Sequence, residues 1–328
     1  MTGLVSAERG VGEIALVDAL PEIVVVVFAA VTHLADPWFL FGLLAIGYWF
    51  GGDRLTASPR RAGATAIAAV TCAYAAVALG KAWFAVPRPP GAMGPADVPT
   101  WLPGLLSAWY EAQVLSDGFG FPSGHATGAA AAYGAMALLY DRAWNRRRRL
   151  LAAAAVAVAV AASRVIIEVH YLVDVLAGLL VGGGAVVVAL WFAGDARFRW
   201  GSTAPAHRGP TADLDPTPAF LLAAVVSVAA AGVAAAGGHT SEVVEAGIGI
   251  ATGAGGVVGW QLVDGDEPTV QARVALPTLA VAGALWVGAY ALSDSLVVTL
   301  VATTAAVVAI VALPAIPERV WEPVIGRS

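Results

Sequence analysis

The sequence predicts an all-α fold: a polytopic membrane helical bundle with a six-helix core and about four extra C-terminal transmembrane helices. Hydrophobic residues make up 59% of the 328 residues and charged residues only 12%. The mean hydropathy of +0.77 is far above that of soluble domains. Apolar stretches of about 20 residues, the length that crosses a bilayer, recur along the chain. These observations place the protein in a membrane.

The apolar pattern predicts ten spans, near residues 16–35, 37–51, 62–80, 124–141, 150–166, 171–193, 218–237, 243–263, 274–292 and 295–313. The first two are the least regular. Asp18 and Glu22 interrupt the first, and Asp36-Pro37 leaves the second short. Residues 5–20 are therefore expected either to span the membrane or to lie along its interface. His33 is interpreted as a polar residue at the end of the first span.

A polar stretch at residues 194–217, rich in Gly, Pro, Thr, Asp and Arg, predicts a cytoplasmic linker. It divides a membrane core, residues 1–193, from a C-terminal membrane module, residues 218–328, to which the sequence assigns no function. Gly249-x-x-x-Gly253 and Gly255-x-x-x-Gly259 permit close helix approach, either to other helices of the chain or in a homo-oligomer. Solvated turns explain the polar residues of the module, which include His239, Glu242 and Glu245.

The positions of the basic residues predict the topology. Arginines cluster after the second, fourth and sixth spans, at Arg54, Arg60, Arg61, Arg142, Arg146 to Arg149, Arg197, Arg199 and Arg208. The positive-inside rule places these loops in the cytoplasm. Lys81, Arg88 and Arg164 are the strong bases that the first six spans leave for the extracytoplasmic face of the cell membrane. The net charge of −5 does not indicate a basic surface of the kind that binds nucleic acid.

Three short strings carry residues suited to phosphate chemistry. They are Lys81-Ala-Trp-Phe-Ala-Val-Pro-Arg88-Pro89, Pro122-Ser123-Gly124-His125, and Ser163-Arg164 followed by His170 and Asp174. Each string lies at the extracytoplasmic end of a predicted span. In a helical bundle these ends can converge on one cavity near the lipid headgroups.

The first string predicts a cation pair at the end of a helix. Pro87 and Pro89 are expected to stop the helix and leave Arg88 on an extended turn. A guanidinium can grip a phosphate through two parallel hydrogen bonds. Lys81 is the sole lysine of the sequence and adds a compact charge. For either residue alone, the alternative is an interfacial anchor that reaches toward headgroups.

The second string opens a helix that can bind an anion. Ser123 is a candidate N-cap, and the free amides of the first turn favour negative charge. Gly124 would let a phosphate oxygen approach the backbone closely. His125, when protonated, could donate to a leaving oxygen. A simple helix start would explain Ser123 and Gly124 but not the histidine.

The third string predicts an activated histidine. His170 and Asp174 are one helical turn apart and share a face. The carboxylate can hold the proton on one ring nitrogen and leave the other free for attack. A structural pair is the alternative. Three nearby cations would repel a divalent ion, so no metal and no cofactor is expected.

An outer loop at residues 90–120 is rich in Pro, Gly and aromatic residues, including Trp101, Trp109 and Tyr110. An interfacial aromatic belt is one interpretation. A substrate lid or lipid gate is the other.

Together, the three strings resemble the signature of the PAP2 superfamily, the type 2 phosphatidic acid phosphatases and their relatives. The resemblance covers residues 15–193 and implies a six-helix core without a metal. It further implies that His170 is a nucleophile forming a phosphohistidine, that Asp174 supports it and that His125 protonates the leaving group. The residues that it implies for phosphoryl binding are Lys81, Arg88, Ser123, Gly124 and Arg164.

This resemblance leads us to expect a metal-independent membrane phosphatase acting on a lipid phosphate or diphosphate, such as a phosphatidate-like lipid or a polyprenyl diphosphate. Two alternatives remain. The same site can transfer the phosphoryl group to another lipid alcohol, or the protein can be a non-catalytic lipid transporter or binding protein.

Overall fold

The computed structural model describes residues 9–194, 211–263, 272–293 and 295–313, and this part of the chain is helical without strands. The N-terminal part contains α1 (Glu13–Val17), α2 (Glu22–Val31), the short 3-10 helix η1 (Thr32–Ala35) and α3 (Pro37–Phe50). The middle contains α4 (Pro59–Phe84), η2 (Pro90–Met93), α5 (Gly104–Val114), α6 (Gly124–Leu139), α7 (Arg146–Ile166) and α8 (Leu172–Phe192). The last four helices are α9 (Thr217–Gly237), α10 (Thr240–Val263), α11 (Ala272–Leu292) and α12 (Leu296–Ala312).

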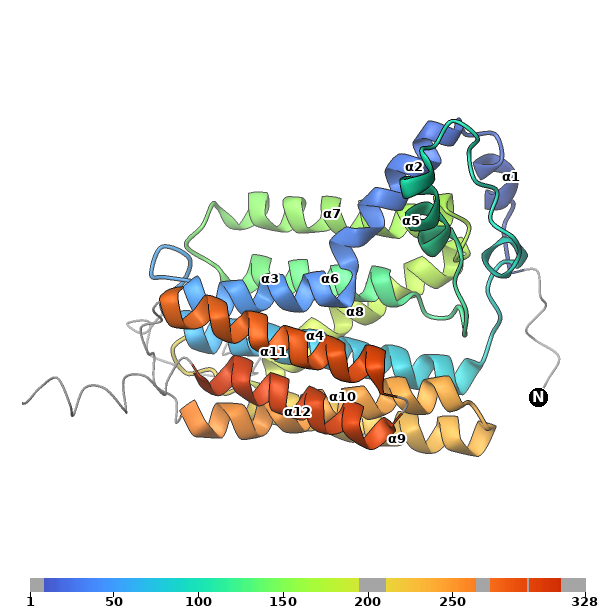
Figure 1. Ribbon diagram of the computed structural model, residues 1–328. Helices are drawn as coiled ribbons and strands as arrows, with labels where there is room; N and C mark the ends of the chain where they lie inside the picture. The colour runs from blue at the N-terminus through green and yellow to red at the C-terminus, as the bar shows by residue number, and fades with distance from the viewer. Residues whose placement is uncertain (1–8, 195–210, 264–271, 294, 314–328) are drawn as a thin grey trace, which may run out of the picture.

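The long helices run side by side, with α4 in the middle of the bundle (Figure 1). Helix α4 packs against α6 and α8 on one side and against α9 and α10 on the other. Its many alanines let neighbouring backbones come close. In its most apolar stretch, 83% of the residues are buried inside the bundle. Helices α4, α7, α8, α9 and α10 are each long and apolar enough to cross a membrane. The chain is thus an integral membrane protein, as its composition predicts.

The first two predicted spans are corrected by the structure, because together they cross the bundle once. Arg9 forms an ion pair with Asp174, and the amide of Ser123 at the start of α6 donates to the carbonyl of Asp174 at 3.0 Å. At the far end of α6, Arg142 donates to the carbonyl of Asp53 at 2.9 Å. The chain between Arg9 and Asp53 therefore runs from one end to the other a single time. Among the described residues, this bent pair joins the five long helices as a sixth candidate span.

The break in this first crossing lies at the polar dipeptide that shortens the second predicted span. Residues Glu22–Ala35 and Pro37–Phe50 meet at an angle of 48°. Pro37 occupies the first turn of α3, where its missing N–H is not needed. Of the uncertain stretch 5–20, the described residues from 9 onward contain only the five-residue helix α1 and do not span.

Close contact between α6 and α8 brings the second and third motifs together. A side chain at Gly178 would lie 2.7 Å from the carbonyl oxygen of Ser123, and one at Gly182 would overlap the carbonyl of Thr127. Because both positions are glycine, the two backbones can touch. This contact sets Asp174 beside the start of α6.

The C-terminal helices pack directly on the core. Phe220 of α9 is fully buried, and the thiol of Cys72 on α4 contacts the carbonyl of Ala219 at 3.1 Å. Gly253 lies against α9 at Ala224, and Gly255 lies against α12 at Thr304. Both Gly-x-x-x-Gly pairs are thus used for packing inside the chain. The predicted domain division and the homo-oligomer remain predictions.

Candidate active site

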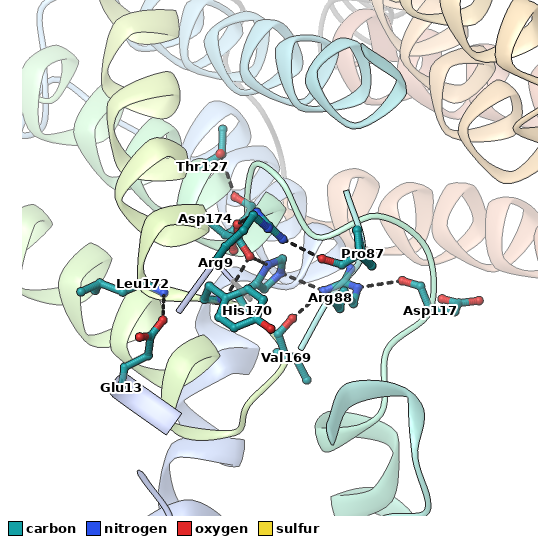
Figure 2. Close-up of polar contacts among 12 residues, drawn as sticks. Arg9, Glu13, Pro87, Arg88, Asp117, Thr127, Val169, His170, Leu172 and Asp174 are labelled. Atoms are coloured by element: carbon teal, nitrogen blue, oxygen red, sulfur yellow. Dashed lines mark hydrogen bonds and ion pairs between the residues drawn. The ribbon is translucent and has the colours of Figure 1, made fainter. Parts of the chain in front are cut away.

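His170 lies in the loop between α7 and α8, with 3% of its surface exposed. Nη1 of Arg88 lies 2.9 Å from Nε2 of the imidazole (Figure 2). A guanidinium is only a donor, so Nε2 accepts and the ring proton of neutral His170 is on Nδ1. Nδ1 faces Oδ2 of Asp174 at 3.5 Å, without hydrogen-bond geometry. The tautomer therefore leaves the lone pair of Nε2 on the Arg88 side.

The charge state of His170 suits a nucleophile. Burial, followed by the positive charges of Arg88 and Arg164, lowers the pKa of His170 well below 6.5. Both effects disfavour the imidazolium. The ring is therefore neutral at physiological pH.

Arg88 is held in place by the loops around it. The guanidinium donates to the carbonyl of Asp117 at 2.8 Å through Nε and to the carbonyl of Val169 at 3.1 Å through Nη1. Helix α4 ends at Phe84, before Pro87, as the proline pair predicts. Burial is the main cause that lowers the pKa of Arg88, and neighbouring carboxylates oppose it. Arg88 is thus a buried, oriented cation beside the histidine.

The carboxylate of Asp174 accepts hydrogen bonds from a backbone amide and from Arg9, a residue that lies outside the three predicted motifs. Its Oδ2 accepts the amide of Tyr171 at 3.0 Å. Its Oδ1 accepts from Arg9, whose other nitrogen donates to the carbonyl of Pro87 at 2.6 Å. The Arg9 guanidinium also lies over the Tyr171 ring, 5.2 Å from its centroid. Arg9 carried no signal, because it is isolated in sequence from the three motifs.

Ser123 and Arg164 offer donors with no partner among the described residues. Ser123 occupies the N-cap position of α6, but its buried hydroxyl makes no capping bond. Arg164 is 4% exposed and donates through Nη1 to the Thr32 hydroxyl at 2.7 Å, while its buried Nε has no partner there. A side chain at Gly124 would meet only Val77, at 3.8 Å, so packing does not explain this glycine. Such donors suit a phosphate oxygen.

His125 is tied to the break in the first crossing. Its Nε2 lies 3.0 Å from Oδ1 of Asp36. The other carboxylate oxygen accepts from Nδ1 of His33 at 2.6 Å and from the indole of Trp38 at 3.0 Å. The interpretation of His33 as a simple span-end residue is therefore wrong. It belongs to a polar cluster around the predicted acid.

Lys81 lies at the same end of the bundle, paired with the C-terminal module. Its ammonium contacts both carboxylate oxygens of Glu245 at 3.0 Å, and it is close enough to help lower the pKa of His170. Two residues that precede Glu245 in the sequence also contact or lie buried near this end of the bundle. His239 meets Phe119 edge to face, with ring centroids 4.8 Å apart, and Glu242 is 5% exposed. The expectation of a solvated position was therefore wrong for Glu242, whereas Glu245 is 49% exposed.

One end of the bundle brings together all eight residues predicted for the site: Lys81, Arg88, Ser123, Gly124, His125, Arg164, His170 and Asp174. Within the described part of the chain, no three His, Cys, Asp or Glu residues are grouped to hold a metal ion. The individual roles of the eight residues remain predictions.

Comparison with known protein families identifies the same region of the chain. The family model of the PAP2 superfamily matches residues 62–198, a segment that contains all eight of these residues. Neither a curated protein nor a solved structure matches the chain.

Proposed function

We propose, from the match of residues 62–198 to the PAP2 superfamily model, that the protein is a membrane phosphatase that hydrolyses a lipid phosphate or diphosphate through a phosphohistidine on His170. The family supports phosphatase-type activity on phosphorylated lipid-like substrates. The observation that carries the finer proposal is the Arg88–His170–Asp174 arrangement, in which the donor at Nε2 and the carboxylate at Nδ1 select one tautomer.

The first step forms a bond between Nε2 of His170 and phosphorus. As the phosphoryl group arrives, Arg88 turns its hydrogen bond from Nε2 to a phosphoryl oxygen. The bond between phosphorus and the leaving oxygen breaks, and protonated His125 gives that oxygen its proton. Asp174 stabilises the positive charge that appears on the His170 ring.

The second step restores the enzyme. His125, now neutral, accepts a proton from water while the water oxygen attacks phosphorus. The bond between phosphorus and Nε2 breaks, and phosphate leaves with neutral His170 restored. Arg88, Arg164, Lys81 and the Ser123 hydroxyl would stabilise the negative charge on the phosphoryl oxygens in both transition states.

The position of the site supports a lipid substrate. The eight residues lie at the ends of α4, α6, α7 and α8 or in the adjoining loops, and α4, α7 and α8 are long and apolar enough to cross a membrane. Such a site meets a headgroup without removing the lipid from the bilayer. We place it on the extracytoplasmic face of the cell membrane, because arginines concentrate at the opposite helix ends. Phosphatidate-like lipids and polyprenyl diphosphates are the leading candidates.

The test is an assay of the purified protein in liposomes against a panel of lipid phosphates and diphosphates. Wild-type protein should release inorganic phosphate from a panel lipid without added metal, and His170→Ala should reduce release to background. A short reaction with radiolabelled substrate, stopped in alkali, should yield acid-labile labelled protein in the wild type only. Activity confined to water-soluble esters would reject the lipid substrate. Full activity in His170→Ala would reject the mechanism.

Products distinguish the neighbouring functions. A new phosphorylated lipid that appears when an acceptor alcohol is added would indicate transfer rather than hydrolysis. Lipid movement that persists in His170→Ala liposomes would indicate a transporter.

A further inference from the structure

The break between η1 and α3 places a carboxylate against the predicted acid. Asp36 leaves the helical path, with φ −59° and ψ 137°, and Pro37 then begins α3. The carboxylate is 14% exposed, and its Oδ1 lies 3.0 Å from Nε2 of His125. An unbroken helix would have kept residue 36 in its ladder of backbone hydrogen bonds. The break instead turns Asp36 toward α6.

Hydrogen-bond direction can be followed through this cluster. The indole of Trp109 can only donate, and it lies 2.8 Å from Nε2 of His33. His33 therefore accepts at Nε2 and donates from Nδ1 to Oδ2 of Asp36 at 2.6 Å. The ionised carboxylate is acceptor-only, so Nε2 of His125 carries a proton toward Oδ1. The remaining nitrogen of His125, Nδ1, is then the atom that can reach a substrate.

We propose that Asp36 is the positioning residue of the general acid, with His33 holding Asp36 in turn. The proposal rests on the proposed function and deepens it. His125 acts among cations, since Arg164 and Arg88 both lie near it. A carboxylate on Nε2 stabilises the imidazolium that must donate from Nδ1 and directs that nitrogen toward the leaving oxygen. The site thus contains two carboxylate–histidine pairs, Asp174 with His170 and Asp36 with His125.

The same chain of contacts reaches the outer loop. Trp109 belongs to α5, which packs against α2 above the site. His33 is thereby fixed from the outer side by Trp109 and from the inner side by Asp36. This gives Trp109 a specific contact beyond membership of an aromatic belt.

Two esters that differ in their leaving group test the proposal. General acid catalysis matters for an alkyl lipid phosphate, whose alkoxide is a poor leaving group, and little for 4-nitrophenyl phosphate. Asp36→Asn should lower kcat/KM for the alkyl ester on the order of 10²-fold and leave that for the aryl ester nearly unchanged. The retained aryl activity also shows that the variant is folded. Asp97→Asn, which removes an exposed carboxylate from the outer loop, should change neither rate.

Two further comparisons separate positioning from general packing. Asp36→Asn should add little to the loss caused by His125→Ala, because both changes remove one function. His33→Asn, whose amide can replace the Nδ1 donor, should retain more alkyl-ester activity than His33→Ala. Equal losses on both esters, or additive losses in the double variant, would overturn the proposal. If the wild type cleaved neither the alkyl nor the aryl ester, the proposed function on which this proposal rests would be overturned instead.

Discussion

At the scale of single residues, the site depends on three charged partners from outside the motifs. Arg9 binds Asp174, Asp36 binds His125, and Glu245 binds Lys81. Each of these predicted site residues therefore has its charge or orientation influenced by a residue distant in sequence. The notable case is Lys81, because its partner comes from the C-terminal module.

The protonation of His170 gives a prediction for pH dependence. Attack requires neutral His170, and its lowered pKa keeps the ring neutral as the pH falls below 6.5. The acid limb of kcat/KM should therefore have its midpoint below 6.5. Initial rates across a pH series check this. An acid midpoint at or above 6.5 would contradict the assignment of His170.

Glu245 gives a second prediction at this scale. The carboxylate neutralises Lys81 and disfavours a second anion nearby, so Glu245→Gln should strengthen inhibition by inorganic phosphate. Because Glu245 is 49% exposed, solvent screening limits the effect to about two- to fivefold. Phosphate inhibition constants measure it, with Glu111→Gln on the exposed part of α5 as the control. Weaker inhibition in Glu245→Gln would mean that the carboxylate holds Lys81 in its binding position.

At the scale of elements, the contact between α6 and α8 sets the distance between the two histidine motifs. The glycines of α8 that face α6 have the carbonyls of Ser123 and Thr127 as neighbours. At the adjacent Gly183 and Gly184, an added Cβ would meet no atom within 4 Å. The face of α8 that carries Gly178 and Gly182 therefore allows backbone contact with α6. The face that carries Gly183 and Gly184 has room for a side chain.

Gly182→Ala tests this contact. The added methyl would overlap Thr127, so α6 and α8 must separate, at a cost of about 1–3 kcal/mol for an overpacked position. The midpoint of thermal unfolding in detergent and kcat should both fall. Gly183→Ala adds the same methyl on the open side and should preserve both. Unchanged stability and activity in Gly182→Ala would show that the contact does not position the site.

At the scale of the whole molecule, the first crossing determines where the N-terminal segment lies. With one crossing between Arg9 and Asp53, residues 9–21 share the site end with the outer loop. Two spans would have placed this segment at the opposite end. The C-terminal helices then complete the bundle on the other side of α4, with α10 reaching Lys81 (Figure 1).

Cysteine labelling tests this arrangement. Cys72 is buried and can be replaced by Ser to give a background without cysteine. New cysteines at Val11, Asp97 and Trp144, all exposed positions, should divide into two groups. An impermeant maleimide added to intact cells should label positions 11 and 97, and position 144 only after permeabilisation. Shared labelling of positions 11 and 144, with 97 in the other group, would restore the two-span topology.

Much of the architecture was predictable because lipid imposes a local rule. A crossing helix needs about 20 apolar residues, and this requirement is visible in the sequence without any knowledge of neighbours. The predicted spans from 62–80 onward correspond to α4, α6 and the six helices from α7 to α12. The prediction failed for 16–35 and 37–51, where hydropathy cannot distinguish two short spans from one broken span.

The sequence by itself determined the membrane class, the positions of eight apolar helices and the eight residues gathered at one end, because each follows from composition or from spacing within a short string. Only the tertiary structure decided that the first two spans merge and that Arg9, Asp36 and Glu245 join the site. These three residues lie 165, 89 and 164 positions from their partners. Pairing over such distances depends on how the helices pack. Isolated polar residues form no periodic sequence pattern from which these pairs could be predicted.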